Sequence, residues 1–438
     1  MEFASAHGVW RSKPMVDHEE YWSRIRERGV AALAEELTAE ETERLTEEYG
    51  AHNYHPLPVV IARAEGAWAY DTEGRAYLDC IGAYSAVSHG HLSPFLVETA
   101  CAQLRVSALT SRAMYTPQLA LFLEGLCRFT ECEMACPMNT GAEAVETAIK
   151  IARKWAYTRK GVPDDRAEIV VAAGNFHGRT TTIVGFSSED AYKRHFGPFT
   201  PGFVTVPFGD ISALAAAITP STAAVLMEPI QAEAGILIPP DGYLAAVRTL
   251  CDQNNILLIW DEIQTGFGRA GRKFAWQYED ARPDLLCLGK ALGGGVMPVS
   301  AVAGTRDAME VLHPGDHGST FGGSPLACAV ALAALAEMEV SNLAGRSAVL
   351  GARLLAGLRA LEDPRIEDVR GRGLLAGLEF HAGTDTGALT QAFLHAGLLT
   401  KETRHRTFRF APPLTIDESL TDEIVRRVAL ALAATVGG

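Results

Sequence analysis

Lys290 and Asp261 are the residues of this 438-residue chain whose types and positions most clearly suggest chemistry. Lys290 follows the apolar run 285–289, and Asp261 follows the apolar run 256–260. In an open α/β sheet the carboxyl ends of such strands meet at the crevice where ligands bind. A lysine there can form an imine with an aldehyde, and an aspartate can keep a pyridine nitrogen protonated, which together suit pyridoxal phosphate. The alternative is that the two residues end separate strands without sharing a site.

The segments around this pair resemble the cofactor-binding region of the class III aminotransferases, which have fold type I of the pyridoxal-phosphate-dependent transferases. The resemblance rests on residues 257–271, on Lys290 with the glycine before it, and on the glycines at 293–295. Other segments are similar to the ornithine δ-aminotransferase branch of that family, namely 49–58, 84–87, 137–141, 172–176, 228–231, 317–320 and 409–414. These segments follow one another in order along nearly all of the chain.

The resemblance implies a set of cofactor-binding residues, which are Thr140, Gly141, Ala142, Phe176, His177, Asp261, Gln264, Lys290, Ser319 and Thr320. Thr140 and Gly141 open a helical run whose first free amides suit a phosphate, although a Thr-Gly pair is also an ordinary helix start. Phe176 is expected to stack on the pyridine ring, with core packing as its alternative, and Gln264 to bind the phenolic oxygen. Ser319 and Thr320 are expected to reach the neighbouring subunit's cofactor, which implies a homodimer with shared sites.

The resemblance also implies a substrate pocket for L-ornithine and 2-oxoglutarate, built from Tyr54, Tyr84, Arg179, Glu233 and Arg409. Arg409 is expected to hold the α-carboxylate of 2-oxoglutarate, and Glu233 to neutralise Arg409 when the donor is bound. Tyr54 and Arg179 are expected to hold the α-carboxylate of ornithine, and Tyr84 to favour ornithine over shorter or uncharged ω-amino acids. Arginine suits carboxylates because its planar fork donates two parallel hydrogen bonds. Lys290, once displaced by the substrate amine, is the expected base for the proton shift.

Four positions depart from the common pattern of that branch, namely His177, Ala232, Trp260 and Ser324. Ala232 and Trp260 adjoin the gate residue and the aspartate, so strict ornithine preference is less secure than transamination itself. One alternative is a related class III enzyme that acts on lysine, acetylornithine or 4-aminobutyrate, or an amino-acid racemase. Another is a catalytically inactive protein of the same fold that serves as a binding or structural subunit. The presence of Lys290 counts against this alternative.

Composition excludes several other classes of protein. The net charge of −14 makes nucleic acid and anionic membrane surfaces unexpected partners. The apolar runs fall short of the roughly 20 residues that span a bilayer. Cysteines and histidines do not show the paired spacing of a zinc site, so a metal is not expected. The N-terminal residues lack a basic segment followed by an apolar one, and they are rich in acid, so a cytoplasmic location is expected.

The pattern of elements predicts an α/β protein. Short apolar runs at 168–173, 203–206, 223–227, 256–260, 285–288 and 299–303 alternate with helical stretches, which indicates a mostly parallel sheet covered on both faces. The family implies seven strands and a smaller α+β domain built from both termini. The expected divisions are an acidic helical extension at 1–48, a joining segment at 49–90, a large cofactor domain at 91–332 and a small domain at 333–438. The extension carries 12 acidic and 6 basic side chains.

Overall fold

The computed structural model describes residues 18–404 and 406–435. These residues form two compact units by their internal contacts. Among them, the first unit takes in residues 18–63 and Ala69–Ala76, and the second takes in Ala64–Trp68 and the chain from Tyr77 onward. The four-part division expected from the sequence stays a prediction.

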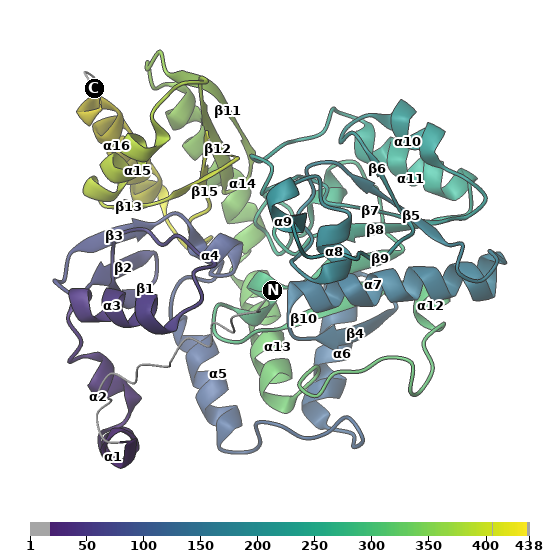
Figure 1. Ribbon diagram of the computed structural model, residues 1–438, viewed down its shortest axis with the longest axis horizontal. Helices are drawn as coiled ribbons and strands as arrows, with labels where there is room; N and C mark the ends of the chain where they lie inside the picture. Colours follow the sequence, from purple (N-terminus) through teal and green to yellow (C-terminus); the bar gives the residue numbers. More distant parts are fainter. Residues whose placement is uncertain (1–17, 405, 436–438) are drawn as a thin grey trace, which may run out of the picture. The chain divides into compact units, whose positions relative to one another are not determined.

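A seven-stranded sheet forms the centre of the second unit (Figure 1). Its strand order is β4-β10-β9-β8-β7-β5-β6. Neighbours from β9 to β6 are all parallel, whereas β10 runs antiparallel to both β9 and β4. The expected mostly parallel sheet of an α/β fold is therefore confirmed. The strands are β4 (Met134–Met138), β5 (Glu168–Ala172), β6 (Phe203–Val206), β7 (Thr222–Met227), β8 (Leu257–Asp261), β9 (Leu285–Leu288) and β10 (Ser300–Gly304).

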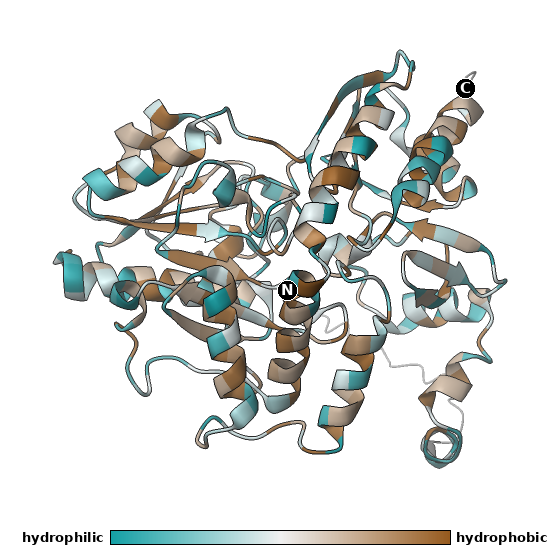
Figure 2. Cartoon of the chain, turned by 180° about the vertical axis from the view of Figure 1, so that it is seen from behind, coloured by the Kyte–Doolittle hydropathy of each residue, from teal (hydrophilic) through white to brown (hydrophobic). Residues whose placement is uncertain are grey.

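Both faces of this sheet are buried, which explains why its strands have continuous apolar sequences. Leu257 and Ile259 of β8 pack on the face covered by α7 (Gly141–Trp155). Leu258 and Trp260 point to the other face, where they join one core with α6 and α11. Figure 2 shows the hydrophobic colour along these strands. The bounds of these two helices are Pro117–Thr130 for α6 and Tyr243–Gln253 for α11.

A smaller α+β part is formed toward the C-terminus. Its antiparallel sheet has the order β11-β12-β15-β14, and Gly377 of β12 lies opposite Arg409 of β15. A further strand, β13, pairs in parallel with β3 (Ala76–Asp79), so that Leu398 lies opposite Leu78. The elements are α14 (Leu343–Arg359), β11 (Ile366–Arg372), β12 (Leu375–Phe380), α15 (Thr386–His395), β13 (Leu398–Leu399), β14 (Lys401–Thr403), β15 (Thr407–Phe410) and α16 (Glu418–Ala434).

Shorter helices and turns connect these layers. They are α4 (Gly82–Ser85), α5 (Pro94–Leu104), η1 (Ala156–Lys160), α8 (Thr181–Gly185), α9 (Asp190–Lys193), α10 (Ile211–Ala217), η2 (Ala275–Tyr278), η3 (Lys290–Gly293), α12 (Arg306–Met309) and α13 (Pro325–Val340). Within the described part of the chain, no single helix has the length and apolar character to cross a bilayer, although the bent pair α13 and α14 meets that test jointly by length and composition alone.

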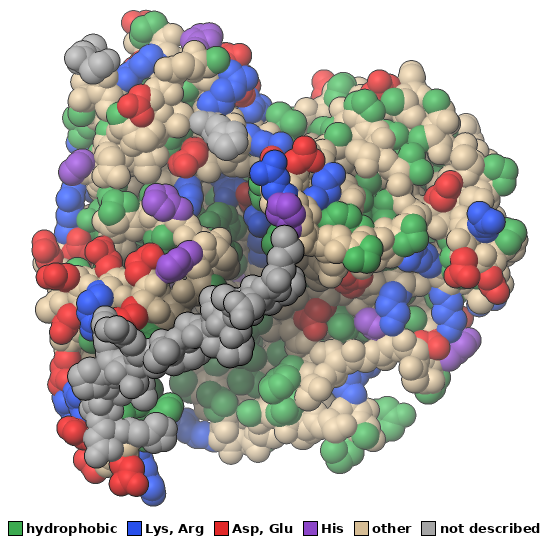
Figure 3. Space-filling model, viewed as in Figure 1, with side chains coloured by type: hydrophobic (Ala, Val, Ile, Leu, Met, Phe, Trp, Pro, Cys, Tyr) green, Lys and Arg blue, Asp and Glu red, His purple; other side chains and the backbone are tan. Residues whose placement is uncertain are grey.

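The first unit is largely helical and exposed. Its helices are α1 (His18–Arg28), α2 (Val30–Ala34) and α3 (Ala39–Tyr49), and α2 and α3 contain no buried residue. Thr38 and Glu41 cap the start of α3 by exchanging hydrogen bonds between side chain and backbone. Acidic side chains gather over α1 and α3 in Figure 3. Helices thus occupy most of residues 18–49, while residues 1–17 of the expected extension lie outside the described residues. Two further strands are β1 (Ile61–Glu65) and β2 (Trp68–Asp71), and β3 (Ala76–Asp79) follows.

Candidate active site

Asp261 and Lys290 line the same cavity at the carboxyl edge of the large sheet. Asp261 is the last residue of β8, and Lys290 follows β9 after one glycine. Because β8 and β9 are parallel neighbours, their ends bring the two side chains to one edge. The cavity has a volume of about 200 Å³. Its lining residues are Gly141, Ala142, Phe176, His177, Gly178, Glu228, Ile230, Asp261, Ile263, Gln264, Thr265 and Lys290.

Lys290 has the electrostatic character of a nucleophilic amine. Removal from water lowers its pKa to about 8, the nearby Arg409 cation acts in the same direction, and the carboxylate of Glu233 opposes the change. Lys290 also has a φ of 45° at the start of the 3-10 turn η3, a backbone conformation that L-residues rarely adopt. A lysine with this pKa is partly neutral near physiological pH, and the neutral form is the one that attacks a carbonyl carbon.

Asp261 is held on both of its oxygens. The backbone N–H of Ile263 donates to Oδ1 over 3.0 Å, and His177 Nδ1 lies 2.6 Å from Oδ2. Since the carboxylate accepts, His177 is the donor, and this contact fixes its tautomer. The His177 side chain has no exposure, and its Nε2 has no hydrogen-bond partner among the described residues. The pair fixes the direction in which Asp261 can accept a hydrogen bond from a ligand.

Glu228 also lines the cavity, although the sequence prediction of site residues missed it. Its Oε2 accepts the backbone N–H of Phe176 over 3.2 Å. Burial, and then the neighbouring Asp261, raises the pKa of Glu228 well above its usual value. Burial and a neighbouring carboxylate both disfavour the charged form of this carboxyl. The signal was present in the sequence, because Glu228 follows the apolar run of β7 just as Asp261 ends that of β8.

The start of α7 forms another wall. Thr140 caps the helix, since its Oγ1 accepts from Glu143 N and its own N–H donates to Glu143 Oε2 over 2.7 Å. Thr140 itself is exposed and does not line the cavity, whereas Gly141 and Ala142 do. A Cβ at Gly141 would stand 3.0 Å from Ile263 Cδ1, so a side chain there would require Ile263 to shift. Free amides at a helix start attract an anion such as phosphate.

Arg409 and Glu233 form an ion pair beside Lys290. Arg409 Nη1 donates to Glu233 Oε1 over 2.5 Å and to Gln264 Oε1 over 2.9 Å, and Gln264 Nε2 donates to the same Glu233 oxygen. Burial alone would raise the pKa of Glu233, but the Arg409 and Lys290 cations hold it below its usual value. The Arg409 guanidinium also lies over the Tyr84 ring, 5.0 Å from its centroid. Arg409 therefore contacts three other predicted site residues, namely Glu233, Gln264 and Tyr84.

The remaining predicted residues lie elsewhere. Arg179 is exposed, with its guanidinium 3.6 Å from the centroid of the Tyr192 ring and 5.5 Å from that of Phe176. Ser319 Oγ accepts from Asn139 Nδ2 over 2.8 Å, next to the cap of α7, and Thr320 is exposed. Neither Ser319 nor Thr320 lines the cavity of its own chain. Tyr54 belongs to the first unit and is exposed.

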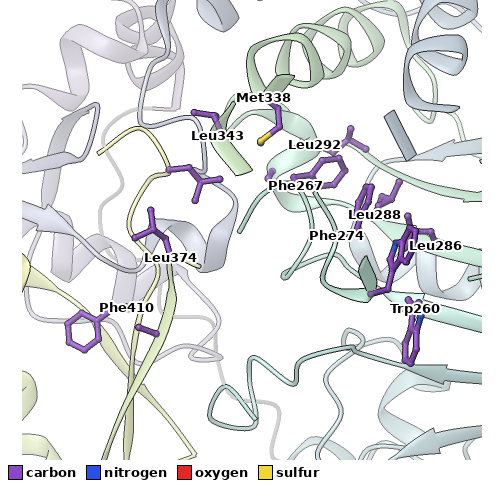
Figure 4. Close-up of a cluster of buried hydrophobic side chains, with 14 of the residues drawn as sticks. Trp260, Phe267, Phe274, Leu286, Leu288, Leu292, Met338, Leu343, Leu374 and Phe410 are labelled. Atoms are coloured by element: carbon purple, nitrogen blue, oxygen red, sulfur yellow. The ribbon is translucent and has the colours of Figure 1, made fainter. Parts of the chain in front are cut away.

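The positions that depart from the common pattern are mostly structural. Trp260 is fully buried on the sheet face opposite the cavity, where its Nε1 donates to Ala281 O, and Figure 4 shows it among other core side chains. Ala232 is also fully buried and packs with Ile236. Ser324 precedes α13 as its N-cap residue. His177 is the exception, because it contacts Asp261 directly.

The family model for class-III aminotransferases matches residues 49–432. The chain therefore belongs to the class III aminotransferases. It is 52% identical over 390 residues to an ornithine aminotransferase of Brevibacillus brevis, which covers 89% of this chain and 97% of the relative. It is also 52% identical over 383 residues to an ornithine aminotransferase of Halalkalibacterium halodurans, covering 87% of this chain and 96% of the relative.

Solved structures agree with this assignment. An ornithine aminotransferase of Toxoplasma gondii superposes with a TM-score of 0.90 and 39% identity, covering 96% of this chain and 99% of that one. An acetylornithine aminotransferase of Elizabethkingia anophelis superposes with a TM-score of 0.83 and 40% identity, covering 91% and 100%. The fold expected from the sequence is therefore confirmed at the level of the family.

Proposed function

We propose that this protein transfers the δ-amino group of L-ornithine to 2-oxoglutarate with pyridoxal 5′-phosphate as cofactor. The products would be glutamate and glutamate 5-semialdehyde, which cyclises to pyrroline-5-carboxylate, in a ping-pong mechanism. The ion pair between Arg409 and Glu233, beside the amine of Lys290, is the observation that carries this proposal. An enzyme that alternates a diamino acid with a dicarboxylate in one pocket needs a carboxylate site that can be switched.

The cavity fits the proposed cofactor in the chemistry of its walls. The α7 start with Gly141 and Ala142 would hold the phosphate, Asp261 would accept a hydrogen bond from the pyridine nitrogen, and the half-buried Phe176 would lie against the ring. When bound through Lys290, the cofactor supplies an electron sink for the substrate carbon. A crystal structure of the Toxoplasma gondii ornithine aminotransferase is described with partial occupancy of this cofactor.

The protein's own residues would act on protons and on charge. The neutral Lys290 amine would take a proton from the substrate carbon and return it elsewhere, as a positioned general base. Its pKa of about 8 suits both directions of that transfer at physiological pH. His177 would keep Asp261 oriented, and Gln264 would link the phenolic side of the cofactor site to the Arg409 and Glu233 pair.

The substrate selection would follow from the state of the Arg409 and Glu233 pair. While Glu233 neutralises Arg409, the α-carboxylate of ornithine finds no strong anchor there and would be held instead by Tyr54 and Arg179, so that the distal amine points to Lys290. When 2-oxoglutarate enters, its α-carboxylate would displace Glu233 from the guanidinium. Tyr84 borders this pocket through its contact with Arg409.

A related reaction is the second candidate. The similarity to an acetylornithine aminotransferase at 40% identity favours it over the lysine, 4-aminobutyrate and racemase alternatives. Ornithine and N-acetylornithine both carry a δ-amine and an α-carboxylate, so they differ mainly in the charge on the α-nitrogen. The absorbance experiment below distinguishes the two donors.

Absorbance spectroscopy tests the proposal. The purified protein, loaded with pyridoxal phosphate, is expected to show a visible band that L-ornithine bleaches and 2-oxoglutarate restores. N-acetylornithine, lysine and 4-aminobutyrate are tested in parallel. Lys290→Ala is the control, which should fold but lose both responses by several orders of magnitude, because it lacks the nucleophile and the base. Bleaching by N-acetylornithine in preference to ornithine would overturn the substrate assignment, and no response to any amine would overturn transamination.

The proposal includes a homodimer with shared active sites in the cytoplasm. Ser319 and Thr320 stand apart from their own chain's cavity, as expected for residues that serve a neighbour. Phe321, which follows Thr320 in the sequence, is a large apolar side chain that is exposed, and Met114 and Tyr115 are exposed as well. Exposed apolar surface of this kind is what a second copy of the chain would cover.

A further inference from the structure

Arg269 is a fully buried cation whose hydrogen-bond acceptors are uncharged. Its Nη1 donates to Leu374 O over 2.8 Å and to Pro412 O over 2.6 Å, and its Nη2 donates to Ser88 Oγ over 3.1 Å. Burial and the proximity of Arg409 lower its pKa to about 9. A buried charge costs free energy unless its contacts compensate for it. The proposed function assigns no role to Arg269.

Two of these acceptors lie next to the ends of β15, the strand that carries Arg409, and of its neighbour β12. Leu374 immediately precedes β12, and Pro412 follows β15 by two residues. The two strands pair so that Gly377 faces Arg409. The Arg269 guanidinium therefore joins the residue before β12 to a residue just after β15 by hydrogen bonds. These bonds limit how far the backbone of Arg409 can shift.

The third acceptor, Ser88, belongs to the segment that carries Tyr84. Three successive residues of this segment have positive φ, namely Ala83 at 46°, Tyr84 at 58° and Ser85 at 75°. Such conformations are costly for residues with side chains, and they persist only where the surroundings fix them. Ser88 Oγ, the atom that Arg269 holds, donates to Ser85 O over 3.1 Å at the end of the strained stretch.

Backbone contacts connect the same segment to the strand of Arg409. Leu414 N donates to Ser88 O over 2.8 Å, and Ala411 N donates to Cys80 O over 2.7 Å. At the start of the segment, Asp79 Oδ1 accepts from the N–H groups of Ile81 and Gly82, each over 2.9 Å. The ring of Tyr84 is thereby presented to Arg409 by a segment fixed at both ends.

We propose that Arg269 is a positioning residue for substrate selection: by holding Ser88, Leu374 and Pro412 with one guanidinium, it sets the Tyr84 ring against Arg409. The proposal rests on the proposed function only in taking Tyr84 and Arg409 as the substrate-facing pair. Arg269 does not touch the substrate. Its influence passes through Ser88 to the strained backbone of Tyr84, and through the two carbonyls to the strand of Arg409.

A double-mutant cycle tests this route. Ser88→Ala removes the hydroxyl that joins Arg269 to the Tyr84 segment and leaves Arg269 its two carbonyl acceptors. Selectivity is measured in single turnovers as the ratio of the bleaching rates with L-ornithine and with 4-aminobutyrate. Ser88→Ala should lower this ratio by about fivefold, a coupling of the size found for contacting residues. In a Tyr84→Ala background the same change should alter the ratio by less than about twofold.

Ser347→Ala is the matched control. Ser347 is a fully buried serine like Ser88. Its Oγ donates to the backbone O of Arg269 and accepts from the backbone N of Leu374, each over 3.0 Å. Its loss therefore leaves all three acceptors of the Arg269 guanidinium in place, including Ser88 in the Tyr84 segment. It should lower the melting temperature as Ser88→Ala does and leave the selectivity ratio unchanged. Arg269→Lys, which keeps a charge but lacks the planar fork, should lower the ratio at least as much as Ser88→Ala.

The outcomes are distinct. An unchanged ratio in both Ser88→Ala and Arg269→Lys, an equal change in Ser347→Ala, or full additivity with Tyr84→Ala would each show that Arg269 only stabilises the fold. Failure of the proposed function is seen separately, in the unaltered protein, as a visible band that does not respond to L-ornithine. The double-mutant cycle can then still be measured with any two amine donors that bleach the visible band.

Discussion

The charge state of each side chain around Lys290 decides what the site can bind. Glu228, Glu233 and Asp261 all lie close enough to affect the Lys290 pKa, as does Arg409. Burial raises the pKa of Glu228 and disfavours its charged form, and Glu233 and Arg409 are paired with each other. Asp261 and the partly neutral Lys290 amine therefore remain as groups that a ligand can engage. This arrangement leaves Asp261 free to bind a protonated ring nitrogen and Lys290 free to attack an aldehyde.

The Lys290 pKa predicts a pH dependence of cofactor capture. The rate at which the cofactor-free protein reacts with pyridoxal phosphate should rise about tenfold per pH unit below pH 8 and level off above it, because only the neutral amine attacks. Glu233→Gln should move the midpoint to lower pH, since the Glu233 carboxylate opposes the lowering of the pKa. Stopped-flow absorbance measures both rates. A midpoint near 10, or one that Glu233→Gln does not move, would contradict this assignment.

The ion pair predicts opposite defects for its two members. Glu233→Ala leaves an unpaired guanidinium that can hold the α-carboxylate of ornithine and turn the α-amine toward Lys290, so δ-selectivity should fall by roughly 1–3 kcal/mol while the half-reaction with glutamate persists. Arg409→Ala should chiefly impair the 2-oxoglutarate half-reaction. Single-turnover absorbance and product analysis distinguish the two. Equal losses in both half-reactions for both variants would mean that the pair merely supports structure.

At the scale of elements, the sequence predicted the strands best where burial on both faces requires a continuous apolar run. The runs at 168–173, 223–227, 256–260 and 285–288 became β5, β7, β8 and β9, because a strand covered on both faces must be apolar throughout. The direction of β10 was not predictable from its composition, since direction depends on the connection. β4 was missed because its sequence, with Pro137 inside, does not resemble a buried strand.

The sequence predicted the site residues that stand at strand ends, but not the contacts between residues that are far apart in the chain. Side chains at strand ends, such as Asp261 and Lys290, have a position that local sequence indicates. His177 and Asp261 are 84 positions apart, and no local sequence pattern predicts their contact. The proposed role of Arg269 could not be predicted from the sequence either, because two of its three acceptors are backbone carbonyls, which every residue has.

The turn after β8 supplies a prediction about stability. Glu262 is fully buried, accepts from Thr265 Oγ1 and from Trp276 N, and burial raises its pKa to about 8. A carboxyl with a raised pKa stabilises the fold below its unfolded-state value, near 4.5, and this contribution is lost as the pH rises toward 8.

Glu262→Gln should therefore gain stability relative to the unaltered protein as the pH rises. The free energy of unfolding of the variant, compared with that of the parent, should increase by a few kcal/mol between pH 5 and pH 8, because glutamine has no proton to lose. Any pH-independent cost of the amide cancels in this comparison. Urea titrations at the two pH values measure it, and parallel changes in the two proteins would show that Glu262 does not titrate in this range.

At the scale of the whole molecule, the family match begins at residue 49, so the helices α1 and α2 and nearly all of α3 precede it. The residues of the cavity all fall between Gly141 and Lys290, and the proposed substrate gate adds Arg409. Ser319 and Thr320 fall within the same match but do not line the cavity. One chain therefore supplies the side chains that we propose as catalytic, while its phosphate site is expected to need a second copy.

Mixing two inactive variants tests that expectation. One chain carries Lys290→Ala, and the other carries Ser319→Ala with Thr320→Ala, which should weaken phosphate binding and impair turnover. If Ser319 and Thr320 serve the neighbouring subunit, each mixed dimer contains one site with an intact Lys290 from one chain and intact Ser319 and Thr320 from the other. Random exchange at equal amounts makes half of the dimers mixed, so the activity should recover to about a quarter of the unaltered value. If these two residues instead act within their own chain, no mixed dimer contains an intact site, and mixing should leave the activity at the level of the two variants measured separately.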